Sequence, residues 1–115
     1  MIKVSFEQKD NKLTLKLKGH AGQANVGHDI VCSSASILAY TVAQLVKVAE
    51  AQGDLKNAPE VKLESGDAVI SCEPIDEARN GVLSAYMFAE VGYNLLSHNF
   101  PQYVELKPFG TAELP

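Results

Sequence analysis

The sequence lacks an excess of basic residues. Ten Lys and Arg stand against 14 Asp and Glu, which gives a formal net charge of -4. Proteins that bind nucleic acid by neutralising its phosphates carry a basic stripe, whereas the basic cluster here is modest: Lys12, Lys16 and Lys18 in "KLTLKLK". Strand alternation places those three side chains on one solvated face. We therefore expect no direct nucleic-acid binding, and at most a modest docking surface for another macromolecule.

The sequence also lacks a long apolar run. No uninterrupted stretch reaches the roughly 18 apolar residues of a membrane span, and the opening "MIKVSFEQKD" lacks the apolar region of a signal peptide. These absences favour a cytoplasmic protein without a membrane partner. Cysteine is scarce, with Cys32 and Cys72 alone. In a reducing compartment we expect both to be thiols rather than a disulfide.

Low-complexity segments are absent as well, and the only internal repetition is a loose two-fold one in the order of the predicted elements. A length of 115 residues falls in the usual range of one domain. With 46% apolar residues the chain can bury a core, and its composition is not that of a disordered protein. We therefore expect a single domain over residues 1–115.

Alternating apolar and polar residues predict two hairpins. The first joins strands near residues 2–7 and 13–18 through the turn segment "QKDN". The second joins "EVKLE" and "AVISC" through Ser65-Gly66-Asp67, which is a tight turn signal. A last short strand is expected at "YVELK", residues 103–107. The sequence thus predicts five strands in total.

Apolar residues at helical spacing predict two helices, one from about Ser33 to Gln52 and one from Asp76 to near Ser97. The apolar side of the first is expected at Ile37, Leu38, Thr41, Leu45, Val48 and Ala49. The apolar side of the second is expected to be core rather than a cofactor pocket, and comprises Val82, Leu83, Tyr86, Met87, Val91 and Leu95. The order ββαββαβ predicts an α+β fold, a two-layer domain in which two helices pack on one face of an antiparallel or mixed β-sheet.

The stretch "GHAGQANVGHDIVCSSAS", residues 19–36, gathers glycines and reactive side chains. From Gly19 to Val31 it shows no periodic element, and a connection of thirteen residues is a candidate for function because most connections take about four to six. Gly19, Gly22 and Gly27 are expected to let this loop bend over a substrate. The loop matches no nucleotide-binding pattern, and we expect no cofactor.

Cys32 and His20 bracket this loop. Cys32 is expected at or just before the first turn of the first helix, where unpaired N–H groups and the helix dipole favour a thiolate. His20 ends the second strand and is expected to reach Cys32 as a general base and then a general acid. The N-terminal amides of the helix are expected to stabilise an oxyanion. Asp29 either caps the helix or orients His20, and Ser36 adds a hydroxyl one turn after Cys32.

Other interpretations of these residues remain open. A cysteine most often fills a core, and a loop histidine most often lies at the surface or forms a hydrogen bond. His20, His28, Asp29 and Cys32 are all possible zinc ligands, but their spacing matches no paired-cysteine or H-E-x-x-H pattern, so we expect no metal. Cys72 ends the apolar strand "AVISC" without an adjacent histidine, which favours core packing.

The same stretch resembles the signature of the ribosomal-processing cysteine protease family, Prp. The family pattern is a Gly-His-Ala segment, matched at residues 19–21, then a Gly-x-Asp-Ile-Val-Cys segment, matched at 27–32, and a serine four residues after the cysteine, matched by Ser36. The chain departs from the pattern at Ser33 and Ser34, where small apolar residues are usual. The resemblance implies a compact α+β fold and a cysteine protease domain.

The resemblance also implies residue roles and a substrate. Cys32 would be the nucleophile and His20 the general base, with Asp29 and Ser36 supporting the site. Members of the family act as homodimers and remove a short N-terminal extension from the precursor of large-subunit ribosomal protein bL27 during ribosome maturation. The alternative, from another class of function, is a noncatalytic ribosome-assembly or peptide-binding module in which the same loop holds an extended segment.

Overall fold

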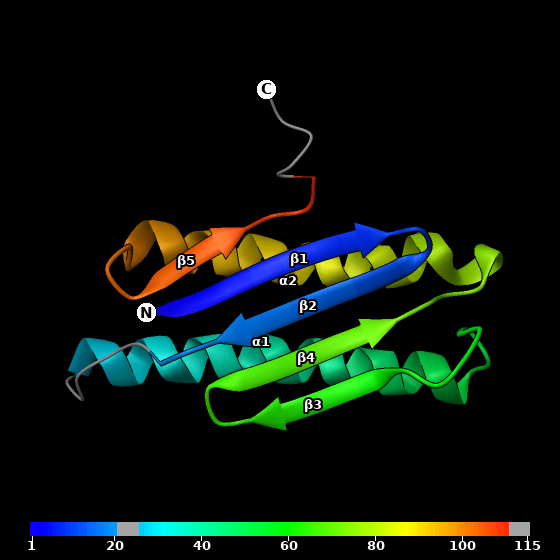
Figure 1. Ribbon diagram of the computed structural model, residues 1–115, viewed down its shortest axis with the longest axis horizontal. Helices are drawn as coiled ribbons and strands as arrows, with labels where there is room; N and C mark the ends of the chain where they lie inside the picture. The colour runs from blue at the N-terminus through cyan, green and yellow to red at the C-terminus, as the bar shows by residue number, and fades with distance from the viewer. Residues whose placement is uncertain (21–25, 111–115) are drawn as a thin grey trace.

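The computed structural model describes residues 1–20 and 26–110, with the backbone alone for residues 26–29. Its strands are β1 (Ile2–Lys9), β2 (Lys12–Lys18), β3 (Glu60–Glu64), β4 (Asp67–Cys72) and β5 (Val104–Lys107). Its helices are α1 (Val26–Ala51), the short 3-10 helix η1 (Asp76–Ala78) and α2 (Arg79–Asn99). The elements follow one another in the predicted order, since η1 leads directly into α2 (Figure 1).

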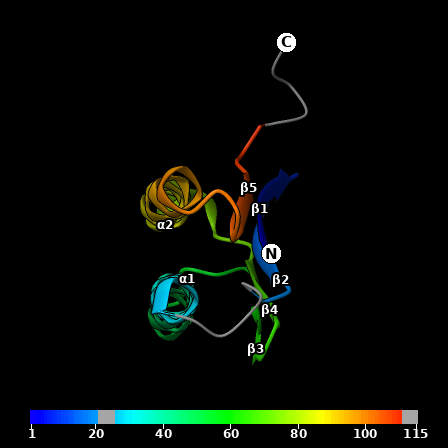
Figure 2. The same ribbon diagram turned by 90° about the vertical axis from the view of Figure 1, so that its left-hand side faces the viewer.

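The five strands form one mixed sheet in the order β3-β4-β2-β1-β5 (Figure 1). β1 and β5 are parallel, whereas the β1–β2, β2–β4 and β3–β4 pairs are antiparallel. Both helices cover the same face of the sheet, so that the fold has two layers (Figure 2). The predicted α+β fold is therefore confirmed, and the sheet is the mixed one of the two alternatives.

Strand alternation decides which side chains enter the core. Every second residue from Ile2 to Phe6 in β1 and from Leu13 to Leu17 in β2 is buried, namely Ile2, Val4, Phe6, Leu13, Leu15 and Leu17. Removing these apolar side chains from water supplies about 25 cal/mol for each Å² buried. The lysines of "KLTLKLK" lie between them and are exposed. The solvated face predicted for Lys12, Lys16 and Lys18 is confirmed.

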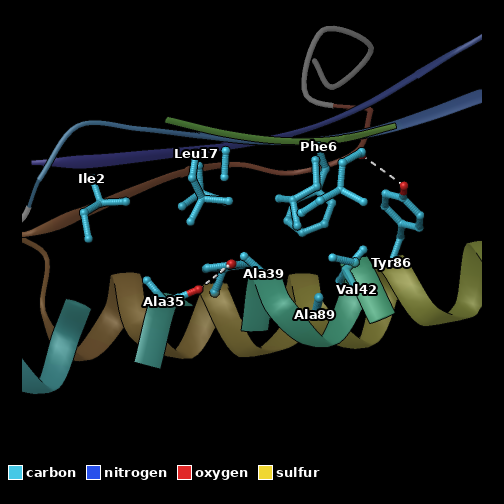
Figure 3. Close-up of a cluster of buried hydrophobic side chains, with 14 of the residues drawn as sticks. Ile2, Phe6, Leu17, Ala35, Ala39, Val42, Tyr86 and Ala89 are labelled. Carbon is cyan, nitrogen blue, oxygen red and sulfur yellow. Dashed lines mark hydrogen bonds between the residues drawn. The ribbon is translucent and has the colours of Figure 1, made fainter. Parts of the chain in front are cut away.

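Two tyrosines of α2 are fully buried in this core. The hydroxyl of Tyr86 donates a hydrogen bond to the carbonyl of Ile70 in β4 at 3.0 Å, and the hydroxyl of Tyr93 donates one to the carbonyl of Ala35 in α1 at 2.8 Å. Figure 3 shows the Tyr86 side chain reaching from its helix toward the strands. Burial raises the pKa of both phenols far above the ordinary range. Satisfied hydroxyls let these large side chains enter the core without an unpaired polar group.

The helix α1 differs from the prediction in both its start and its buried face. It begins at Val26, seven residues before the predicted Ser33, so the segment that looked aperiodic is partly helical. Its buried face consists of small residues, Val31, Ala35, Ala39, Val42, Ala43, Val46 and Ala49. Ile37 is 60% exposed, and Leu45 and Val48 are also exposed. The helix has two apolar stripes, and the stripe of small residues faces the sheet, which lets helix and sheet approach closely.

The predicted core face of α2 is right in part, since Tyr86 is buried and Val82 and Leu83 pack against the core. Its buried residues are Tyr86, Ala89, Tyr93 and Leu96, whereas Met87, Val91 and Leu95 are exposed. Phe88, 77% exposed, lies beside them on the outside of the layer. Gly92 explains the close approach of α2 to α1, because a Cβ at this position would lie 2.8 Å from both methyl carbons of Leu38. The outer faces of both helices thus expose large apolar side chains.

One stretch of α1 passes a composition test for a membrane span. The segment Ile30–Ala51 has 22 residues and a mean hydropathy of 1.4. A core helix of a soluble protein passes the same test, and Ala35, Ala39 and Val42 of this helix pack against the sheet (Figure 3). Part of the high hydropathy of α1 therefore comes from residues that are buried in the core between helix and sheet.

Candidate active site

A cavity of about 310 Å³ opens between α1, the end of β2 and the β3–β4 turn. Its floor is apolar, with Ile2, Leu17, Ala35, Ala39 and Ala68 among the lining residues. Four of the predicted site residues, Gly19, His20, Cys32 and Ser36, line this cavity. The structure therefore brings together residues that reach the site from β2 and from α1. A cavity of this size can accept one or two side chains of a peptide.

His20 follows β2 and is exposed, but its backbone is tied to neighbouring segments. The terminal amine of Met1 donates a hydrogen bond to the carbonyl of His20, and the N–H of Gly19 donates one to the carbonyl of Gly66 at 2.9 Å. Gly19 has a φ of +94°, and a Cβ there would lie 2.4 Å from the carbonyl oxygen of Met1. Only glycine fits such a position. The histidine thus leaves the sheet at a defined point.

Cys32 is half-buried and is the seventh residue of α1. The early start of the helix overturns the prediction that this thiol lies at the helix N-terminus. Unpaired N–H groups belong to the first turn, and the effect of the helix dipole falls off within that turn. Six residues of helix place Cys32 about 9 Å from Val26 along the axis. The helix end therefore does not account for an activated thiol, and amides of the first turn do not account for an oxyanion site beside it.

Ser36 lies one turn after Cys32 on the same side of α1, as predicted, and is half-buried. Tyr40 lies one turn further and also lines the cavity. Tyr40 was not predicted as a site residue, although the i, i+4, i+8 spacing of residues 32, 36 and 40 could have indicated it. Thiol, hydroxyl and phenol therefore form a polar stripe along one wall of the cavity.

The β3–β4 turn forms one wall of the cavity, and no motif in the sequence indicated it. Leu63, Glu64, Ser65, Gly66 and Asp67 line the cavity from this turn. Their sequence distance from Cys32 leaves no local periodicity that links them to the site. Sheet order brings them there, because β4 pairs with β2, the strand that precedes His20.

Asp67 is the best-anchored charge of this turn. The ammonium groups of Lys18 and Lys62 each lie 2.6 Å from one of its carboxylate oxygens. These two hydrogen-bonded lysines hold the pKa of Asp67 below its ordinary value. The carboxylate therefore stays ionised and fixes the first residue of β4 beside the cavity.

The remaining predicted residues have other outcomes. Gly27 lies within α1 and not in a loop, so its predicted role as a substrate-loop hinge is wrong. Gly22 and the side chains of His28 and Asp29 lie outside the described residues. Among the described side chains, no group of three or more His, Cys, Asp or Glu residues is placed to hold a metal ion.

The two cysteines have different surroundings. Neither forms a disulfide, and the core packing predicted for Cys72 is confirmed, since the side chain is 2% exposed. Cys32, by contrast, shares a cavity with an imidazole. A thiol and an imidazole on one accessible cavity are the groups that nucleophilic attack on a peptide carbonyl requires.

Comparisons with solved structures show the same fold. SMU.848 from Streptococcus mutans superimposes with a TM-score of 0.65 at 23% identity, over 95% of this chain and 94% of that one. The essential ribosomal processing protease Prp from S. aureus, in complex with a substrate peptide, has a TM-score of 0.67 at 18% identity, over 94% of this chain and 99% of that one. Its complex with a covalently linked product peptide gives 0.66 at 19% identity, with the same coverage.

Comparisons of sequence show the family. No curated protein matches the chain. The family model described as Cysteine protease Prp matches residues 1–105, which leaves only the last ten residues unmatched. This match agrees with the cysteine and histidine found on one cavity and with the fold of the solved structures. The chain therefore belongs to the Prp family of cysteine proteases.

Proposed function

We propose that this protein is an endopeptidase that removes the short N-terminal extension of the ribosomal protein bL27 precursor, with Cys32 as nucleophile and His20 as general base. The observation that carries the proposal is the common cavity of these two residues in a chain of the Prp family. The S. aureus relative, described as a ribosomal processing protease in complex with a substrate peptide, supports the class of substrate.

In the proposed mechanism, His20 accepts the thiol proton of Cys32, and the sulfur attacks the scissile carbonyl carbon. The tetrahedral intermediate collapses as the C–N bond breaks, and the imidazolium gives its proton to the departing amine. A water molecule, deprotonated by His20, then hydrolyses the thioester and releases the extension as a carboxylic acid. Each cycle consumes one water and regenerates the thiol.

The other polar groups have supporting parts in this proposal. The hydroxyl of Ser36 lies on the cavity wall one turn from Cys32, where it can donate a hydrogen bond to bound substrate. Asp29 is the fourth residue of α1, so the prediction that it caps this helix is wrong. Its other predicted role, as the partner that orients His20, stays part of the proposal. We also propose that the protein acts in the cytoplasm, where ribosomal proteins are assembled.

Cleavage of the purified precursor tests the proposal. The wild-type chain should shorten the precursor, and Cys32→Ala should lower the rate by at least about 10³-fold because no other group replaces the nucleophile. Cys72→Ala is the matched control, since it removes the other thiol but leaves the cavity intact. Cleavage by Cys32→Ala would overturn the assignment, and tight binding without turnover by the wild-type chain would favour the noncatalytic module.

We further propose that the protein is a homodimer whose interface is the outer face of the helix layer. This face, defined by Ile37, Tyr40, Leu45, Val48, Met87, Phe88, Val91 and Leu95, is apolar and exposed on both helices. An apolar groove lined by residues of both helices, with Leu45 and Phe88 among them, connects its two halves. Exposed apolar patches of this kind are typical of protein interfaces.

A charge on this outer helix face tests the proposed dimer. Phe88→Arg should convert a dimer into a monomer in sedimentation experiments, because the 77% exposed ring would be covered by a partner and a buried unpaired guanidinium is costly. Gln8→Arg adds the same charge at an exposed position of β1 and should leave the mass unchanged. A wild-type monomer at high protein concentration would contradict the proposal.

A further inference from the structure

The tip of the β3–β4 turn lies against the imidazole of His20. A Cβ added at Gly66 would lie 2.5 Å from Nε2 of His20, 2.9 Å from Cε1 and 3.3 Å from Cδ2. The same glycine accepts a hydrogen bond through its carbonyl from the N–H of Gly19, at 2.9 Å. Gly66 therefore meets the histidine segment in two ways. Its carbonyl binds the N–H of Gly19, and the His20 ring lies where a side chain at residue 66 would begin.

Turn geometry alone does not account for this contact. Gly66 has a φ of +71°, which glycine adopts readily. Asn and Asp also tolerate positive φ in turns, but each has a Cβ, and a Cβ at this position would occupy the place of the ring. A Cβ at Gly66 would therefore displace the imidazole from its place, in addition to any strain in the backbone.

We propose that Gly66 is a positioning residue for catalysis, whose bare backbone sets where the imidazole of His20 lies relative to Cys32. The inference rests on the proposed role of His20 as general base. Sheet pairing fixes the turn, because Glu64 and Asp67 pair across it and Asp67 is held by two lysines. The ring therefore lies against a rigid surface that belongs to a distant part of the sequence.

Gly53 provides a matched control. It also has a positive φ, +77°, but a Cβ there would have no atom within 4 Å. Alanine imposes a comparable backbone strain at both positions, yet only Gly66→Ala pushes on the histidine ring. A difference between the two variants therefore reports on the ring and not on the strain of the turn.

The first experiment compares cleavage kinetics of the two variants on the precursor. Gly66→Ala should lower kcat by about 10- to 100-fold with little change in KM, because a small displacement of a catalytic group is costly in rate. The pH profile of kcat/KM should change in the same variant, and the NMR signals of the His20 imidazole should shift. Gly53→Ala should leave all three measurements unchanged. Equal kinetics and unchanged His20 signals in Gly66→Ala would overturn the proposal.

A double-mutant cycle of unfolding free energies tests the contact without cleavage. If the new methyl group strikes the ring, Gly66→Ala should destabilise the wild-type chain more than it destabilises His20→Ala, whose short side chain leaves room. Equal destabilisation in both backgrounds would show that Gly66 serves the turn alone. Cleavage by His20→Ala would instead disprove the role of the histidine, and the NMR shift and the cycle would still report on the contact.

Discussion

Cys32 and Cys72 are the same residue type in two regions of opposite character. Cys32 lies half-buried on α1, on a cavity that it shares with His20. Cys72 ends β4 inside the core, where its sulfur lies 3.6 Å from the hydroxyl of Tyr86. Burial raises the pKa of the Cys72 thiol, and the hydrogen bond with Tyr86 only partly offsets this.

This difference in surroundings predicts a difference in reactivity between the two thiols. The thiolate is the reactive form, and burial among apolar side chains disfavours it. The Cys72 side chain is buried and packs against the other residues of the core. At Cys32 the cavity gives access to solvent and to an imidazole, which are the conditions for chemistry. The same fold therefore buries one thiol in the core and places the other on a cavity.

Alkylation of the native protein should separate the two thiols by the largest factor. We expect Cys32 to react at least about 10³-fold faster than Cys72, because a buried thiol reacts only when the core opens and a core opens at a cost close to the global stability. Mass spectrometry of Cys32→Ala and Cys72→Ala measures each remaining thiol by itself. In denaturant both variants should react at similar rates. Comparable rates in the native protein would contradict the predicted difference in accessibility between Cys32 and Cys72.

A smaller effect is expected from Tyr86→Phe. The change deletes the hydroxyl that bonds the carbonyl of Ile70 and contacts the sulfur of Cys72, so the free energy of unfolding should fall by about 1 kcal/mol. Denaturant unfolding measures the loss, and the alkylation rate of Cys72 should rise about fivefold with it. Cleavage of the precursor should keep its wild-type rate. A slower cleavage at unchanged stability would show that the core of α2 acts on the site directly.

The strands were predictable because alternation is a local signal. Ile2, Val4 and Phe6 are buried at every second position as the pattern indicated, and the Ser65-Gly66 turn joins two paired strands. The helix faces were not predictable, because α1 has two apolar stripes and periodicity does not rank them. Ala35 and Ala39 are inside and Ile37 outside, since close approach to the sheet favours small side chains over more apolar ones.

The candidate site was predictable in part for the same reason. His20, Cys32 and Ser36 lie within 17 residues of sequence, and all three line the cavity. Gly66 and Asp67 were missed because they come from another hairpin. The start of α1 at Val26 was missed because the glycine and polar residues of "VGHD" hide the helical period, and this error misplaced Cys32 relative to the helix end.

The sequence by itself indicated the residues that we propose to carry the chemistry. It also determined the order of the elements and the strand faces, because these depend on residue type and on spacing along the chain. Only the tertiary structure decided which helix stripe packs on the sheet and which turn lies against the imidazole. Both depend on contacts between segments that are distant in sequence. Whether a small or a large side chain fits such a contact depends on the residue that it meets there. At Gly66 the relevant neighbour is His20.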